Sequence, residues 1–135
     1  MKHVLFYIPT RSDAEERLMR ATEGLVTARN LRVCRNSENL RRGLLNRLNS
    51  PSAVVLLTVT KQDLLNLIPV RSLLLDFRVI MVLPDSDDVT LAMGWSMWPR
   101  FVSYADGDLR DVAAVLSQII GTSSPQAGAK GVRAA

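Results

Sequence analysis

Short runs of apolar residues alternate along this chain with segments whose apolar positions recur at helical spacing. The most apolar run, residues 53–60, reads Ala-Val-Val-Leu-Leu-Thr-Val-Thr and carries no charge. Because the side chains of a strand alternate between two faces, a run that is apolar on both faces needs cover on both sides. This run is therefore predicted to be a central strand of a parallel sheet that is covered by helices.

The same pattern predicts five strand–helix units. Strands are expected over residues 2–9, 31–35, 53–60, 78–83 and 100–105. Helices are expected over roughly 13–29, from Asn36 or Ser37 to about residue 48, and over 61–76, 89–97 and 109–120. Pro69 should kink or break the third of these helices, because proline removes an amide and clashes with the preceding turn. Gly121 should end the last helix.

Local signals refine three of these helices. Ser12 and Glu15 match a capping box, in which the two side chains bond free amides at a helix start. The inner face of the second helix is predicted to be four leucines, namely Leu40, Leu44, Leu45 and Leu48. The third helix is apolar nearly all round, so one face should pack on the sheet and the rest could be covered by a partner.

Alternation of strands and helices implies a parallel sheet with right-handed crossovers. The strands at 31–35 and 100–105 carry arginine, serine or tyrosine, which suits edge positions. We therefore predict an α/β flavodoxin-like three-layer sandwich with five parallel strands in the order 2-1-3-4-5. Residues 1–122 should form one domain, and residues 123–135, which hold Gly, Ala, Ser and Pro but no core residue, a disordered tail.

Composition narrows the setting of this domain. The chain has 135 residues, and no apolar run approaches the ~20 residues of a membrane helix. A single cysteine, Cys34, excludes an internal disulfide and suits a reducing cytoplasm. The net charge is +4, but Lys130 and Arg133 supply two of those charges. The remaining balance does not by itself indicate nucleic-acid binding.

Five such units with a short fourth helix resemble the response-regulator receiver (CheY-like) domain over nearly the whole chain. The segment from Met93-Gly94 through residues 98–102, Trp-Pro-Arg-Phe-Val, is similar to the Gly-Ala-x-x-[FY] passage that leads into the fifth strand of receivers. The resemblance implies the receiver fold and a role in two-component signal transduction.

The residues with which receivers perform phosphoryl transfer are replaced here. Receivers have an acidic pair after strand one, a phosphoacceptor aspartate at the end of strand three, Thr or Ser after strand four and Lys at the end of strand five. The corresponding positions read Pro9-Thr10-Arg11, Thr58-Val59-Thr60, Leu83-Pro84 and Tyr104-Ala105. Magnesium needs hard oxygen ligands such as carboxylates. We therefore expect a degenerate pseudo-receiver without metal, cofactor or enzymatic activity.

Both tryptophans fall in the fourth helix and the loop before the fifth strand, and two further aromatic residues follow in that strand. The candidate interface residues are Trp95, Trp98, Phe101 and Tyr104. In receivers this face binds dimer partners and downstream proteins, and such side chains are favoured interface anchors. Alternatively, a tryptophan covers the sheet edge within the monomer. The leading hypothesis is a phosphorylation-independent interaction module, with a signalling protein or a second copy as its partner.

A rival hypothesis is a small-molecule or phosphate-ligand binding protein or enzyme at the carboxyl edge of the sheet. Its candidate ligand-binding residues are Thr10, Arg11, Thr58, Thr60, Asp85 and Asp106. The aspartates in the loops after strands four and five could hold a divalent cation, or they could cap the next helices. No G-x-G-x-x-G or Walker motif supports a nucleotide.

Six arginines fall between Arg29 and Arg47, with only Glu38 opposing them. They could form a patch for nucleic acid or an acidic partner, or they could be the solvated faces of a helix and an edge strand. Few aromatic residues lie among them, so base stacking is not supported. His3 and Cys34 are expected to be structural.

Overall fold

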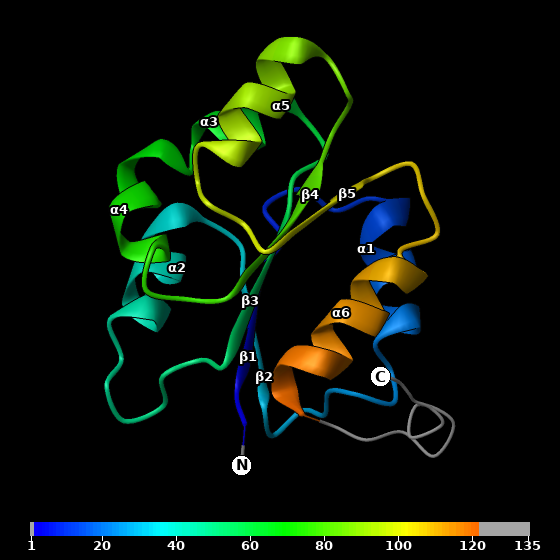
Figure 1. The fold of residues 1–135 in the computed structure, drawn as a ribbon. Coiled ribbons are helices and arrows are strands. Elements are labelled where there is room, and N and C mark those ends of the chain that lie inside the picture. The colour runs from blue at the N-terminus through cyan, green and yellow to red at the C-terminus, as the bar shows by residue number, and fades with distance from the viewer. Residues whose placement is uncertain (1, 122–135) are drawn as a thin grey trace.

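The computed structural model describes residues 2–121 (Figure 1). The strands are β1 (Val4–Tyr7), β2 (Leu31–Cys34), β3 (Ala53–Leu57), β4 (Val79–Leu83) and β5 (Phe101–Tyr104). The helices are α1 (Asp13–Ala21), α2 (Ser37–Leu44), α3 (Lys61–Leu65), the 3-10 helix η1 (Ile68–Val70), α4 (Arg71–Leu74), α5 (Asp88–Trp95) and α6 (Arg110–Ile120). The predicted tail, residues 123–135, lies outside the described residues.

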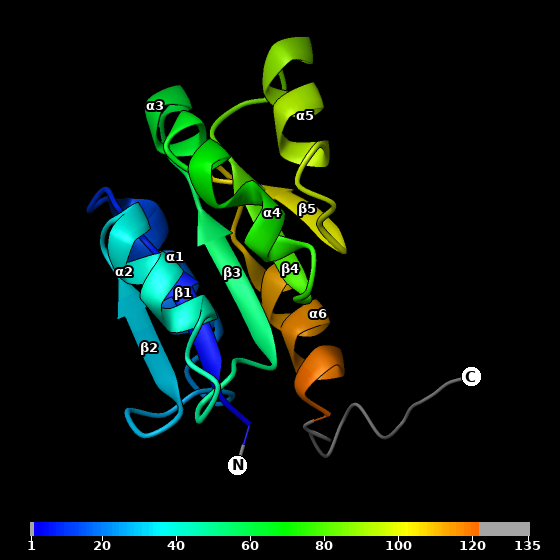
Figure 2. The ribbon, with the colours of Figure 1, turned by 90° about the vertical axis from the view of Figure 1, so that its left-hand side faces the viewer.

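All neighbouring strands pair in parallel, in the order β2-β1-β3-β4-β5. The prediction of a flavodoxin-like α/β fold with this strand order is therefore confirmed. All residues of β3 and β4 are buried, as expected of central strands with helices on both faces. Figure 2 shows β2 at one border of the sheet and β5 at the other.

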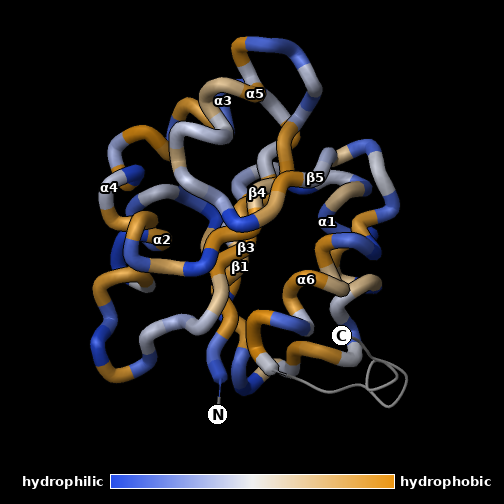
Figure 3. The backbone as a smooth tube through the Cα atoms, viewed as in Figure 1, coloured by the Kyte–Doolittle hydropathy of each residue, from blue (hydrophilic) through white to orange (hydrophobic). Residues whose placement is uncertain are grey.

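Side chains alternate between two apolar layers, one on each face of the sheet. Phe6 and Val55 face α1 and α6, where they pack with Leu116 of α6. The adjacent residues Leu5 and Val54 face the opposite layer, which includes the inner residues of α2, α3 and α4. Figure 3 shows the resulting pattern, in which the central strands are apolar and the helices change character along their length. The sheet thus has an apolar core on each of its two faces. Polar side chains are left mainly at the carboxyl and amino ends of the strands, which we call the carboxyl edge and the amino edge.

The first helix is shorter than predicted. It ends at Ala21, whereas the sequence pattern extended it to about residue 29. The hydroxyl of buried Thr22 donates to the Leu18 carbonyl at 2.8 Å. The Thr22 amide donates to the same carbonyl at 3.0 Å, so Thr22 closes the last regular turn and the backbone then continues as turns. By contrast, the break at Pro69 is confirmed, because α3 ends at Leu65 and the proline lies in η1.

The capping box predicted at Ser12 is wrong. Ser12 occupies the N-cap position, but its hydroxyl makes no capping hydrogen bond. The Glu15 carboxylate instead accepts two hydrogen bonds from Arg35, of 2.9 and 2.8 Å. A bidentate charged pair outcompetes a single bond to a backbone amide. At the second helix, Asn36 is the cap and accepts from the Asn39 amide at 2.8 Å.

The inner face of the second helix is also shorter than predicted. Leu40 and Leu44 are buried, but Leu45 is 53% and Leu48 is 93% exposed. The reason is that α2 ends at Leu44, so the periodicity no longer determines which way the later leucines face.

Candidate functional site

The carboxyl edge of the sheet contains one buried carboxylate, Asp63, which is 6% exposed. Its Oδ1 accepts a hydrogen bond from the Thr10 hydroxyl at 2.9 Å. Its Oδ2 accepts from the backbone amides of Val59 and Thr60 at 3.0 and 3.2 Å. The Thr60 hydroxyl accepts from the Asp63 amide at 3.0 Å, which completes a capping box at the start of α3. Sequence reasoning missed this box, although the Thr-x-x-Asp spacing resembles the known signature.

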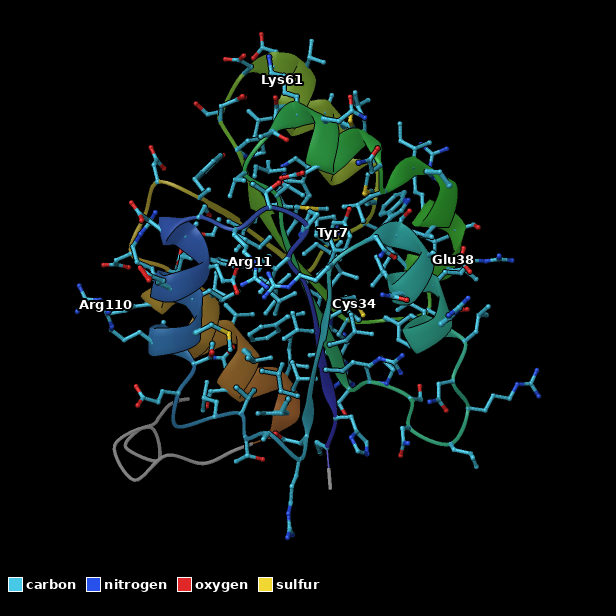
Figure 4. The ribbon with its side chains drawn as sticks, turned by 180° about the vertical axis from the view of Figure 1, so that it is seen from behind. Tyr7, Arg11, Cys34, Glu38, Lys61 and Arg110 are labelled. Carbon is cyan, nitrogen blue, oxygen red and sulfur yellow. The ribbon has the colours of Figure 1, made fainter. Side chains whose placement is uncertain are left out.

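Tyr7, the last residue of β1, lies under this carboxylate and is 1% exposed. Burial, together with the negative charge of Asp63, raises the pKa of Tyr7 to about 12. Figure 4 shows Tyr7 toward the middle of the molecule and Lys61 at its far tip. Because its pKa is raised in this way, the phenol of Tyr7 stays protonated and neutral over the whole physiological pH range.

Of the six predicted ligand residues, two are hydrogen-bonded to Asp63 and a third, Thr58, is bonded to β4 instead. Thr10 and Thr60 both bond Asp63. Thr58, which follows β3, is fully buried, and its hydroxyl donates to the Val82 carbonyl at 2.6 Å. Its oxygen is thereby fixed against β4. Arg11 is exposed, and its charge contributes to lowering the pKa of Glu15. The strongest cause of that shift is the hydrogen bond from Arg35.

The two predicted aspartates belong to different surroundings. The Asp85 carboxylate accepts from the Asp87 amide at 3.0 Å. The Thr90 hydroxyl and this amide lower the pKa of Asp85. Asp106 borders a shallow depression of about 320 Å³ that Arg17 also lines. No group of three or more His, Cys, Asp or Glu side chains within residues 2–121 is arranged to hold a metal ion.

Arg17 of α1 fixes the loop after β5. Its guanidinium donates to the Ala105 carbonyl at 2.8 Å and also to the Gly107 carbonyl. No local signal in the sequence points to the contact between Arg17 and Ala105, which lie 88 residues apart. A cation thus stands beside the carboxyl edge, but backbone carbonyls already hold it.

The four aromatic residues do not form a single cluster. Trp95 is 51% exposed and Trp98 is 73% exposed. Phe101 packs into the layer of α1 and α6, whereas Tyr104 packs into the opposite layer. Side chains alternate between the two faces along a strand, so residues 101 and 104, which are three positions apart, point to opposite faces of the sheet. Trp98 also adopts the left-handed backbone region, with a φ of 55°, which non-glycine residues enter at a cost.

Helix α5 buries only part of its apolar surface, with Leu91 and Met93 packed against the core. Its fully buried residues are Thr90 and Gly94, whereas Val89 is 67% exposed. A Cβ atom at Gly94 would stand 2.8 Å from a methyl of Leu83, so the glycine lets the helix backbone lie directly on β4. The helix thus packs on the sheet through Gly94 together with the half-buried Leu91 and Met93, and it leaves Trp95 and the following Trp98 exposed; we call these two tryptophans the α5 patch.

The six arginines do not act as one patch. Arg35 pairs with Glu15, and Arg42 pairs with Glu38 at 3.4 Å. Arg29 and Arg32 lie at the opposite edge of the sheet, beside a cavity that also includes His3. Cys34 is buried, and that burial raises the pKa of its thiol, so the thiolate is disfavoured.

Comparison with known proteins gives a structural similarity but no match to a family model. No protein-family model matches the chain. No curated protein matches it. Its structure is similar to that of response regulator Rcp1 in the Mn(2+)-bound form, with a TM-score of 0.59 and 12% sequence identity. The similarity covers 93% of this chain and 99% of that protein, which confirms the receiver fold expected from the sequence. Within residues 2–121, no helix is long and apolar enough to cross a membrane.

Proposed function

We propose that this chain is a receiver-like protein-interaction module in signal transduction that functions without phosphorylation. The proposal joins two observations, the receiver fold and an edge whose carboxylate is already engaged. Since a fold by itself does not determine an activity, the edge carries most of the argument.

A carboxylate that accepts a phosphoryl group needs a free oxygen and a nearby cation to neutralise the transferred charge. Asp63 has no free oxygen, because both of its oxygens accept hydrogen bonds and 94% of its surface is covered. The guanidinium of Arg17 at this edge is already bonded to two backbone carbonyls. The position directly after β3 is Thr58, whose hydroxyl is held against β4. These contacts support a structural role for the edge that carries the chemistry in receivers.

The α5 patch is the surface that we assign to a partner. Trp95 and Trp98 are two large apolar side chains exposed only three residues apart, and tryptophan is enriched among the residues that contribute most to binding at interfaces. Trp98 is presented from a left-handed backbone position, which is an unfavourable conformation for a residue that packs on nothing. We assign this surface to a homodimer, with Tyr104 at its margin and Phe101 behind the sheet.

Sedimentation across micromolar concentrations tests the dimer. The intact protein should show concentration-dependent dimerisation that Trp95→Ala or Trp98→Ala weakens at least about tenfold, because buried interface tryptophans commonly contribute 2 kcal/mol or more. Leu48→Ala is the matched control, since Leu48 is 93% exposed but lies in the α2–β3 segment. A strictly monomeric protein at high micromolar concentration would exclude the homodimer.

Two further measurements separate this proposal from a ligand site at the carboxyl edge. Acetyl phosphate should give no stable covalent label, and a labelled aspartate would contradict phosphorylation independence. Thermal-shift screening against nucleotides, phosphates and divalent ions should give no stabilisation that depends on Thr10 or Asp106. A ligand at 100 times its Kd would add about 2.7 kcal/mol, which the assay resolves easily.

A further inference from the structure

A cavity of about 180 Å³ opens at the amino edge of the sheet, at the end opposite the carboxyl edge that holds Asp63. Its lining comes from the starts of β1 and β2 and from the segment that joins α2 to β3. Figure 2 shows these three parts of the chain at the same end of the sheet. Buried Val4 and Leu5 contribute to its lining. Its polar lining consists of His3, Arg29, Asn30, Arg32, Asn46 and Asn49.

The lining carries positive charge and has no acidic side chain. Arg29 and Arg32 are both exposed at this edge, and neither takes part in an ion pair within the described residues. The other arginines of β2 and α2 show the contrast, because Arg35 and Arg42 both pair with glutamates. Two guanidinium groups that share a concave site without a counterion favour an anionic ligand.

The asparagines add hydrogen-bond donors rather than acceptors. The Oδ1 atom of Asn30 accepts from the amide and the hydroxyl of Thr27, at 2.6 and 3.0 Å. The Oδ1 atom of Asn46 accepts from the amides of Leu48 and Asn49, at 3.0 and 3.2 Å. With their oxygens engaged, both side chains have only the NH₂ group left to offer a ligand. Neither asparagine therefore presents a free oxygen that would repel an anion in the cavity.

Volume limits the size of the ligand. A water molecule takes about 30 Å³, so the cavity holds about six non-hydrogen atoms. Drug-sized ligands need about 300 Å³ or more. We propose that this cavity binds a small oxyanion, with inorganic phosphate or the terminal phosphate of a larger molecule as the best match. Arg29 and Arg32 pair with its oxygens, and the amide groups of Asn30 and Asn46 donate to it.

The chain has one histidine, so the ring signals of His3 report on this cavity alone. The experiment uses untagged full-length protein, proton NMR at fixed pH, and phosphate titrated at constant ionic strength. The His3 signals should move and saturate with phosphate. Glycerol phosphate and malonate are titrated in parallel. Tighter binding of malonate than of either phosphate would overturn the assignment to phosphate.

Arg29→Gln with Arg32→Gln should weaken phosphate binding at least about tenfold, since each charge-assisted hydrogen bond contributes about that factor. The control is Arg41→Gln with Arg47→Gln, which removes the same charge from exposed positions outside the cavity. Arg29→Gln alone alters only an exposed side chain and keeps the test valid if the double variant misfolds. Absence of saturation in the native protein, or equal weakening in variant and control, overturns the proposal.

Discussion

Replacement of Asp63 by alanine tests whether the carboxyl edge is structural. The substitution removes three accepted hydrogen bonds, from the Thr10 hydroxyl and from two backbone amides at the start of α3. The bond from the Thr60 amide is one half of the capping box at the start of α3. Hydrogen bonds to a charged group contribute about 1.5–3 kcal/mol each when the donor stays buried. A lost helix cap costs about 1 kcal/mol.

The amides of residues 59 and 60 are near the surface and regain water, so their two bonds together count as one lost helix cap, about 1 kcal/mol. The part-buried bond from the Thr10 hydroxyl contributes about 2 kcal/mol more. We expect Asp63→Ala to lower the free energy of unfolding by about 3 kcal/mol. With an m-value of about 1.5 kcal/mol/M, the urea midpoint falls by about 2 M. Thr10→Val should lose about 2 kcal/mol, and the double variant should lose less than the sum, because the two side chains share one bond.

Asp76→Ala is the matched control, because Asp76 is an exposed aspartate in the segment between α4 and β4. Its urea midpoint should stay close to that of the native protein. The opposite outcome for Asp63 would be informative. A carboxylate kept for activity is commonly replaced with no loss of stability or with a gain. An unchanged or raised midpoint in Asp63→Ala would therefore refute the structural reading of this edge.

Three further predictions concern pH and packing. The hydrogen bond from Arg35 lowers the pKa of Glu15. The ion pair should therefore stabilise the fold above the ordinary pKa of a glutamate and lose this contribution as the pH falls below about 4.5. The urea midpoints of the native protein and of Glu15→Gln should converge in acid. The pKa of Tyr7 is raised to about 12 in the folded protein, so the unfolded chain loses the phenol proton at lower pH. The free energy of unfolding should therefore fall as the pH rises from about 10 to 12. Tyr7→Phe should remove this fall. Gly43→Ala should destabilise the protein by about 1–2 kcal/mol in urea, because the new Cβ would stand 2.5 Å from a methyl of buried Leu5; an unchanged midpoint would mean that α2 can shift at little cost.

The apolar pattern alone determined most of the architecture. Residues 53–60 carry no charge and are apolar on both faces, and a strand of that kind has to lie inside a covered sheet. Polar residues in the strands around Arg32 and Ser103 indicated the two borders, and the strand order followed. These features depend on burial, which local composition encodes directly. Helix ends were less predictable, because the apolar spacing continues through Leu25 and Val26 although α1 ends at Ala21.

Only the tertiary structure decided which polar groups meet. Glu15 matched a local capping pattern, but Arg35, 20 residues later, takes its carboxylate. Thr10 finds Asp63 across 53 residues, and the amino-edge cavity joins three separate segments of the chain. The free energy of a polar contact depends on distance and desolvation, which exist only once the elements have packed. The sequence could therefore specify the layers of this protein, whereas the chemistry of its two edges depended on the fold.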